Sequence, residues 1–294
     1  MKKKILSFGY DDERPYGNLA DTDKGREFRS RKMDFMEQLN QMFDDYNCPR
    51  TFFILGQYLD KCTETVNISR LREIYNKDNS KIDIQQHSYS HPAIRKIAGR
   101  DDKIPMNAKE FAADITKASN TIESIIGVRP YGLRTPLGYP HDLSDLPELV
   151  NELRNAGITY VSSDLRSISD WPEDTLNGPL TKNRQPHNYK NIGVPELIEI
   201  PSHGLQDVVF TEEMSMRFLG VHPWPENKIF DHYNDILIQS DKIDAPVVSV
   251  ALCLHPWAVM EYDKNLNIHK ELITSAKDKG FEIKSYSQVA DMFR

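Results

Sequence analysis

The chain has 294 residues, of which 39% are hydrophobic, so it can bury a large core as one barrel-sized domain or two smaller ones. Its formal net charge of −7 argues against a nucleic-acid partner, which needs a basic face. No low-complexity stretch, long charge run or internal repeat marks a boundary. We therefore expect a single domain over residues 1–294.

The first twelve residues begin like a signal peptide with three lysines, but their apolar run is short and meets two carboxylates. No stretch approaches the roughly 20 apolar residues that a membrane span needs. The three cysteines, which lack metal-ligand spacing, are typical of reduced thiols: Cys48, Cys62 and Cys253. We expect a cytoplasmic protein without a membrane span, and we leave open whether it forms a homo-oligomer.

Strand-like and helix-like segments alternate along the chain. The pattern predicts strands at 4–8, 51–55, 81–84, 130–134, 158–163, 197–201, 247–254 and 281–284. It predicts helices at 26–46, 68–75, 108–126, 143–156 and 268–279, and two helices within 211–239 interrupted near 221–225. The polar stretch 167–194 is interpreted as a long functional loop. Repeated strand-then-helix units predict an α/β fold with a parallel sheet, and their number favours a barrel.

Two histidines, His87 and His91, follow the strand at 81–84 with three residues between them. Both imidazoles can turn to one cation if the backbone curls once at this point. Pro92 disfavours a helical conformation at His91, so we expect a tight turn at the strand end. Taken alone the pair is a weak motif, and ordinary surface histidines are an equally good interpretation.

Six polar residues lie at the C-terminal ends of predicted strands or just beyond them: Asp11, Asp12, His87, Arg134, Asp164 and His255. In a parallel barrel these ends open on one face, where active sites are built. Two histidines and a carboxylate can hold a divalent ion whose bound water loses a proton near neutral pH. A second carboxylate can accept that proton, an arginine can orient this carboxylate, and a histidine can protonate a leaving amine. The pattern predicts amide hydrolysis.

Three motifs carry a family resemblance. Residues 87–91 read His-Ser-x-x-His, residues 134–138 read Arg-x-Pro-x-Gly, and residues 252–255 read Leu-x-Leu-His. In this order, each at a strand end, they resemble the polysaccharide deacetylases, carbohydrate esterase family 4 with its NodB-like homology domain. The resemblance implies a distorted (β/α)7–8 barrel, a TIM-like fold with loop insertions.

The same resemblance implies roles for individual residues. A metal would be held by an aspartate with His87 and His91, with zinc as the first candidate and cobalt, nickel or iron as alternatives. Arg134 would hold the catalytic aspartate, and His255 would be the general acid. The backbone N–H of Leu137 would help to bind the oxyanion.

Two motifs depart from the family pattern. The family's Thr-Phe-Asp-Asp is Ser-Phe-Gly-Tyr-Asp-Asp here, and we assign Asp11 as base and Asp12 as metal ligand. A register aligned on the phenylalanine would instead make Asp11 the ligand and place Gly9 at the base position, as in a weakened or inactive enzyme. The presence of Arg134 favours the first register.

In the fourth motif an insertion separates Asp164 from the Asp-Trp pair that contains Trp171. We assign Asp164 as the partner that tunes His255, and Trp171 as a sugar-stacking or groove-wall residue. The candidate substrate-binding residues are Leu137, Trp171, His203 and Trp257. Four of the remaining histidines are expected to lie on a solvated surface: His141, His187, His232 and His269. Residues 221–224, which contain His222, resemble residues 254–257, and we favour chance over a second site as the interpretation.

The preferred function is a metal-dependent hydrolase that removes an acetyl or formyl group from an amide nitrogen of a sugar or sugar precursor. One alternative is an allantoinase-like amidohydrolase that acts on a small cyclic amide. The other is a catalytically inactive metal- or sugar-binding barrel.

Overall fold

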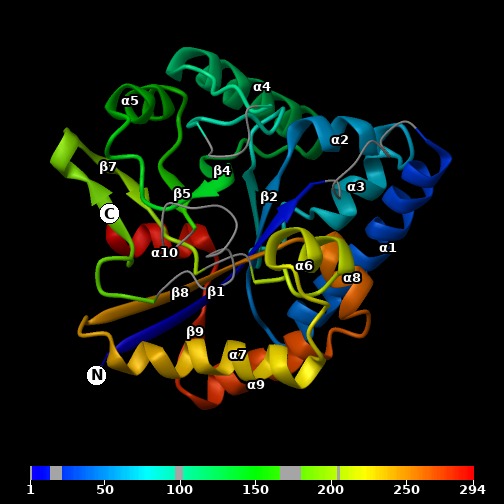
Figure 1. The fold of residues 1–294 in the computed structure, drawn as a ribbon. Helices are drawn as coiled ribbons and strands as arrows, with labels where there is room; N and C mark the ends of the chain where they lie inside the picture. Colours follow the sequence, from blue (N-terminus) through cyan, green and yellow to red (C-terminus); the bar gives the residue numbers. More distant parts are fainter. Residues whose placement is uncertain (1, 14–21, 97–101, 166–179, 204–205) are drawn as a thin grey trace.

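The computed structural model describes residues 2–13, 22–96, 102–165, 180–203 and 206–294 (Figure 1). The strands in this part of the chain are β1 (Lys3–Asp12), β2 (Arg50–Ile54), β3 (Ile82–Gln86), β4 (Gly132–Tyr139), β5 (Tyr160–Asp164), β6 (His187–Tyr189), β7 (Val194–Glu199), β8 (Val247–Leu254) and β9 (Phe281–Ile283). The helices are α1 (Asp23–Asp45), α2 (Gly56–Thr63), α3 (Ile68–Ile74), α4 (Ala108–Ile126), α5 (Pro147–Asn155), α6 (Glu212–Leu219), α7 (Glu226–Gln239), α8 (Pro256–Tyr262), α9 (Asn267–Asp278) and α10 (Tyr286–Phe293), with short 3₁₀ helices η1 (Lys190–Ile192) and η2 (Ser240–Lys242).

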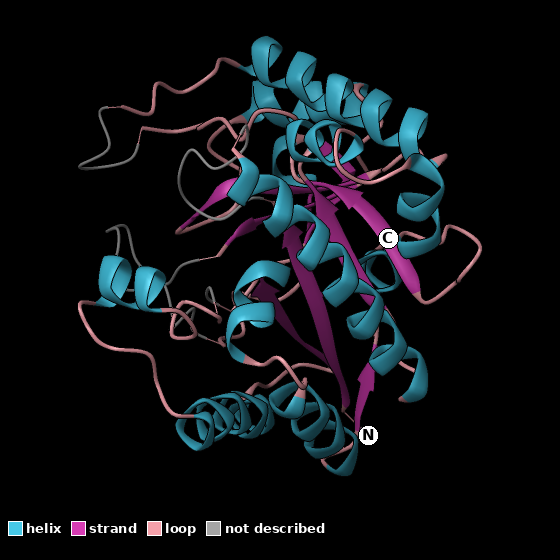
Figure 2. Ribbon diagram, turned by 90° about the vertical axis from the view of Figure 1, so that its right-hand side faces the viewer, coloured by secondary structure: helices cyan, strands magenta, loops and turns pink. Residues whose placement is uncertain are grey.

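The strands form one sheet in the order β6-β7-β5-β4-β3-β2-β1-β8, with β9 beside β1. Neighbouring strands of this sheet are parallel, except that β6 and β7 are antiparallel. Helices flank the sheet on its outer side, as Figure 2 shows from the side. The predicted α/β, TIM-like architecture is confirmed.

Among the described residues strand pairing does not close the sheet, but one segment bridges β5 and the edge strand β8. The backbone N–H of Ser202 donates to the carbonyl of Asp164 in β5 at 2.8 Å. The next N–H, of His203, donates to the carbonyl of Ala251 in β8 at 2.9 Å. The carboxyl ends of β5, β8 and β1 therefore lie around one common space.

Side chains of β1 alternate between two environments, because successive residues of a strand point to opposite faces. Leu6, Phe8 and Tyr10 belong to the large core beneath α1, whereas Ile5 packs inside the barrel with Tyr286 of α10. Gly9 lies on the inner face, where a Cβ atom would come within 2.6 Å of both Arg134 Nη2 and a ring carbon of Tyr286. Only glycine leaves room there for the arginine.

The long helices begin and end where the sequence indicates. The Thr22 side chain accepts a hydrogen bond from the Gly25 N–H at the start of α1, and a capping box of Asn107 and Glu110 starts α4. Gly127, with φ of 85°, ends α4 in a left-handed conformation that glycine adopts readily. The interrupted pair predicted within 211–239 is present as α6 and α7.

Three predictions of local structure were wrong. The stretch 167–194 is not a loop throughout, since its described part contains β6, η1 and the start of β7. Helices α2 and α8 were not predicted, because each is short and directly follows a strand. His269 is not a surface residue: it is 2% exposed, and its Nδ1 lies 2.7 Å from the Asp263 carboxylate.

Candidate active site

The histidine loop is a tight turn at the end of β3. Ser88 and His91 both have positive φ values, of 66° and 59°, and the Ser88 hydroxyl accepts a hydrogen bond from the His91 N–H at 3.1 Å. From α4, the Asp114 carboxylate accepts bonds from the N–H of Tyr89 and the hydroxyl of Ser90 at 2.7 and 2.6 Å. The backbone therefore curls once and holds the two imidazole rings 5.0 Å apart.

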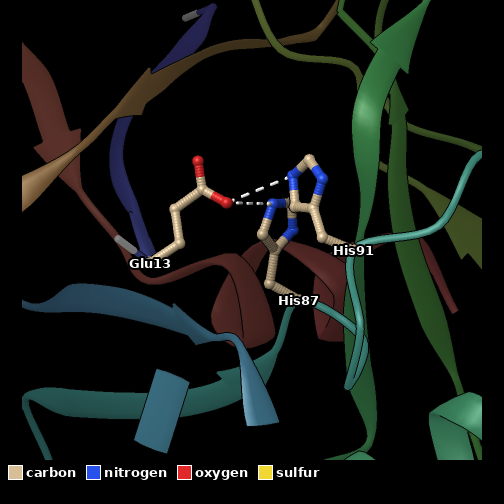
Figure 3. A group of neighbouring side chains, drawn as sticks. All are labelled: Glu13, His87 and His91. Carbon is tan, nitrogen blue, oxygen red and sulfur yellow. Dashed lines mark ion pairs between the residues drawn. The ribbon is translucent and has the colours of Figure 1, made fainter. Parts of the chain in front are cut away.

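The two histidines meet a carboxylate from Glu13, which directly follows β1 (Figure 3). One oxygen of Glu13 lies 3.1 Å from His91 Nε2 and 3.9 Å from His87 Nε2. In the described part of the chain, this is the one group of three potential metal-ligating residues whose ligand atoms all lie within 4.8 Å of one another.

The orientation of His87 and the pKa of His91 both fit metal binding. His87 Nδ1 donates to the backbone oxygen of Arg134 at 2.9 Å, so Nε2 is the ring nitrogen that faces Glu13. Burial lowers the pKa of His91 to about 4, although the neighbouring Glu13 opposes this shift. Two imidazoles and one carboxylate form a donor set that zinc and related divalent ions accept.

A second carboxylate, from Asp11, lies on the same face of β1. Its Oδ1 is 3.3 Å from Arg134 Nε, and its Oδ2 is 3.8 Å from His87 Nε2 and 3.3 Å from the Cys253 thiol, which donates to it. The Arg134 guanidinium lies between aromatic rings, with its centre 4.5 Å from the ring of Phe53. Burial lowers the pKa of Arg134, but Asp11, Cys253 and Tyr286 together outweigh burial and raise it. Arg134 therefore stays charged beside Asp11.

A third group joins His255 to Asp207. His255 Nδ1 lies 3.2 Å from Asp207 Oδ2, which also accepts the backbone N–H of His255. On its other side, His255 Nε2 lies 3.4 Å from the second oxygen of Glu13. Burial would lower the pKa of His255, but the carboxylates of Asp207 and Glu13 raise it well above its usual value.

These groups line one cavity of about 40 Å³. Its polar wall consists of Asp11, Glu13, His87, His91, Arg134 and His255, and its remaining wall of Thr135, Leu137, Gly138, Ser162, Leu165, Ser202 and Cys253. Leu137 lies at an irregularity of β4, where the pairing with β5 shifts between Arg134 and Tyr139, and it has a positive φ of 73°. Positive φ is costly for a leucine and often marks a functional position.

Asp12, predicted as the metal ligand, points away from the histidines. Its carboxylate is fully buried on the outer face of β1, where it pairs with Lys32 of α1 and accepts the Tyr75 hydroxyl. The error came from treating two adjacent residues as neighbours in space, whereas side chains of a strand alternate. Asp11 and Glu13, two residues apart, share the inner face.

Asp164, predicted as the partner that tunes His255, binds Arg184 instead. Its two carboxylate oxygens accept bonds from Arg184 Nε at 3.1 Å and Nη2 at 2.7 Å, while Asp207 occupies the place beside His255. Arg184 also donates to the Ser202 carbonyl at 3.1 Å. This cluster ties the segment before β6 to the barrel.

The predicted substrate contacts have different outcomes. Leu137 lines the cavity, whereas His203 and Trp257 are buried and do not. His203 Nδ1 accepts the Ala251 N–H at 3.0 Å, and burial lowers its pKa to about 3, so it joins the bridging segment to β8 as a neutral ring. Trp257 packs with its ring centre 5.8 Å from that of His255. Trp171 lies outside the described residues.

Two residues of this site were missed from the sequence. Glu13 had a usable signal, since it lies two residues after Asp11 along a strand. Asp207 had none, because it lies in an irregular segment between β7 and α6 and reaches His255 only through the fold.

Comparison with known proteins agrees with these motifs. The family model for polysaccharide deacetylases matches residues 17–161, which contain both histidines and Arg134. The chain belongs to the polysaccharide deacetylase family. In this family member, Asp11, Glu13, Asp207 and His255 lie outside the matched segment, so their places come from the structure. No curated protein matches the chain.

Solved structures share the fold of this polysaccharide deacetylase family member at low identity. A Mycobacterium smegmatis protein assigned as a polysaccharide deacetylase has a TM-score of 0.63 and 18% identity, over 100% of this chain and 91% of its own. The PuuE allantoinase has a TM-score of 0.63 and 14% identity, over 99% and 90%. A 4-α-glucanotransferase of Thermococcus litoralis has a TM-score of 0.59 and 15% identity, over 100% and 41%.

Proposed function

We propose that this chain is a metal-dependent hydrolase that removes an N-acyl group, acetyl or formyl, from a sugar or sugar precursor. The observation that carries the proposal is the convergence of Glu13, His87 and His91 beside two charge-paired groups, Asp11 with Arg134 and His255 with Asp207. The family supports deacetylation in general. Zinc is the first candidate metal, with cobalt, nickel or iron as alternatives.

Glu13, His87 and His91 would hold the ion, which when bound supplies a Lewis acid and an acidic water. Asp11 takes the proton of the attacking water as general base. Arg134 pairs with Asp11 and orients it, and the rings of Phe53 and Tyr286 fix the guanidinium plane from distances of 4.5 and 5.0 Å. The base is thus held before substrate binds.

His255 donates the proton that the leaving amine needs. Asp207 holds Nδ1 of the imidazolium, so Nε2–H faces the cavity. The backbone N–H of Leu137 is proposed as a donor to the oxyanion, since Leu137 lines the same cavity. Asp11 and His255 line the same cavity, so the base and the acid can act on one bound substrate.

We further propose that residues 1–294 form one catalytic domain in the cytoplasm, which would favour a soluble sugar precursor over finished polymer. Within the described residues, no helix is long and apolar enough to span a bilayer. No nucleic-acid partner is proposed, since the formal charge is −7. Homo-oligomer formation remains a prediction to be tested by the mass in solution.

A second candidate is hydrolysis of a small cyclic amide. It is favoured by the cavity volume of about 40 Å³ and by the fold shared with the PuuE allantoinase. Both candidates use the same ion, base and acid, so substrate shape is what separates them.

The test is a substrate panel with zinc-loaded protein. N-acetylated and N-formylated sugars and sugar nucleotides should release acetate or formate, whereas a cyclic ureide such as allantoin should remain intact. Opening of the ring without acid release from any sugar would replace the first candidate by the second. Protein that binds zinc but turns over neither class would support the inactive barrel.

A further inference from the structure

A closed ionic cluster lies behind the active site, on the outer face of β1. Lys32 of α1 and Asp12 form an ion pair in which neither side chain has any exposed surface. The Tyr75 hydroxyl donates to the other Asp12 oxygen, and the Lys32 ammonium lies 3.9 Å from the ring centre of Tyr58. Three outer elements, α1, α2 and the end of α3, thus contact one strand end.

The Lys32 ammonium also contacts the backbone of Glu13, the candidate metal ligand. Lys32 Nζ donates to the backbone oxygen of Glu13 at 3.2 Å. The Glu13 N–H donates to the Asp11 carbonyl at 3.1 Å, and the Asp12 carbonyl accepts the Leu55 N–H at 3.1 Å. Glu13 lies past the last residue of β1, and in the described part of the chain Lys32 supplies the hydrogen bond to its carbonyl.

We propose that Lys32 is a positioning residue for Glu13 and sets the affinity of the metal site; the inference rests on the proposed metal dependence. Without the ammonium, Asp12 would be a buried carboxylate with no counter-charge, which is strongly disfavoured. A turn of the strand end that brought Asp12 toward water would turn Glu13 away from His87 and His91, because the two side chains point to opposite faces. The buried ion pair therefore fixes which carboxylate faces the imidazoles.

A matched control exists at another buried cation packed against α1. Arg50, at the start of β2, has no exposed side-chain surface and binds Asp44 at 2.5 Å and Asn40 at 2.9 Å. Arg50 is paired across the sheet with Ile82, the first residue of β3. It therefore lies at the opposite end of this strand from His87 and His91. Lys32→Met and Arg50→Met thus remove comparable buried charges, but only the first loses a contact to Glu13.

The experiment measures zinc dissociation constants by calorimetry on metal-free protein, with thermal unfolding of the same samples. Both single variants should unfold at lower temperature. Lys32→Met should raise the zinc Kd by about 10- to 100-fold, as loss of an outer-shell partner does. Arg50→Met should stay within about 3-fold of wild type. An equal loss in both variants, or a wild-type Kd in Lys32→Met, would overturn the proposal.

The double variant Asp12→Leu/Lys32→Met keeps the test decisive if the single lysine variant does not fold. It removes both charges, and apolar replacement of a buried pair is often tolerated. It still lacks the bond to the Glu13 carbonyl, so a zinc Kd raised about 10-fold is expected, and an unchanged Kd overturns the role of Lys32. Wild-type protein that binds no zinc would overturn both this inference and the metal-dependent function, whereas zinc binding without sugar turnover would overturn the function alone.

Discussion

The imidazole of His255 lies 3.4 Å from one carboxylate oxygen of Glu13, while the other oxygen faces the two histidines of the turn after β3. One carboxylate therefore stands between the candidate metal site and the candidate proton donor. The arrangement links metal binding to acid catalysis through a single side chain, and it makes Glu13 the first residue to test.

Glu13→Gln removes the anionic ligand while keeping the shape of the side chain. We expect zinc content after dialysis to fall and the zinc Kd to rise at least about 10-fold, since the site loses its one carboxylate. Elemental analysis and calorimetry measure these changes. Glu196→Gln, at a residue of β7 whose side chain is 54% exposed, is the control and should bind zinc like wild type. Retention of stoichiometric zinc by Glu13→Gln would move the metal site elsewhere.

Asp207→Asn and Asp164→Asn separate the observed partner of His255 from the partner that the sequence predicted. Asp207→Asn weakens the hold on the imidazolium, so kcat should fall by about 100-fold or more. Asp164→Asn disrupts the bond to Arg184, so it should lower the Tm but keep kcat within about 3-fold at a temperature where it is folded. Steady-state rates and thermal unfolding of both variants check this, and the reverse ranking of kcat would restore Asp164 as the partner.

Arg134→Lys keeps the positive charge beside Asp11 but loses the planar stack between Phe53 and Tyr286. We expect kcat/KM to fall by about 100-fold with zinc content unchanged, because the bond to His87 comes from the backbone of residue 134. Rates and metal analysis of the same preparation give the answer. Loss of zinc in parallel with activity would show that the arginine supports the metal site and not the base.

The pair of His187 and Asp142 should make stability depend on pH. Burial lowers the pKa of His187, but the bond to Asp142 at 2.7 Å, the bond to the Gln185 carbonyl and the charges of Glu199 and Asp142 together raise it to about 9. Burial raises the pKa of Asp142, yet bonds from His187 and Ser144 bring it to about 2. The His187 contribution is therefore complete below its unfolded pKa of about 6.5 and is lost as pH rises through 9. The Asp142 contribution is present above its unfolded pKa of about 3.9 and is lost as pH falls toward 2.

His187→Asn should consequently cost most stability between pH of about 4 and about 6.5, and little above pH of about 10. Both side chains are partly exposed, at 36% and 21%, so solvent screening limits the difference to about 1 kcal/mol. Denaturant unfolding of wild type and variant at a series of pH values measures it. A difference that stays constant with pH would assign the loss to packing instead of charge.

The sequence alone was sufficient for the fold class and for the histidine motif. The buried strand at 247–254, the capped helix at 108–126 and the order of strand and helix follow from local periodicity, which depends on near neighbours only. The turn that brings His87 and His91 together is also local, because Pro92 and the Ser88 hydroxyl act within five residues.

Only the tertiary structure decided which acidic residue serves which purpose. Asp11, Asp12 and Glu13 are adjacent in sequence and all carry carboxylates. Their roles differ because side chains alternate along the strand, so that Asp12 points to Lys32 and the other two point to the cavity. Asp207 lies 48 residues before His255, in an irregular segment between β7 and α6 that carries no periodic signal. Contacts of this kind depend on how distant segments pack, and a local pattern holds no information about that packing.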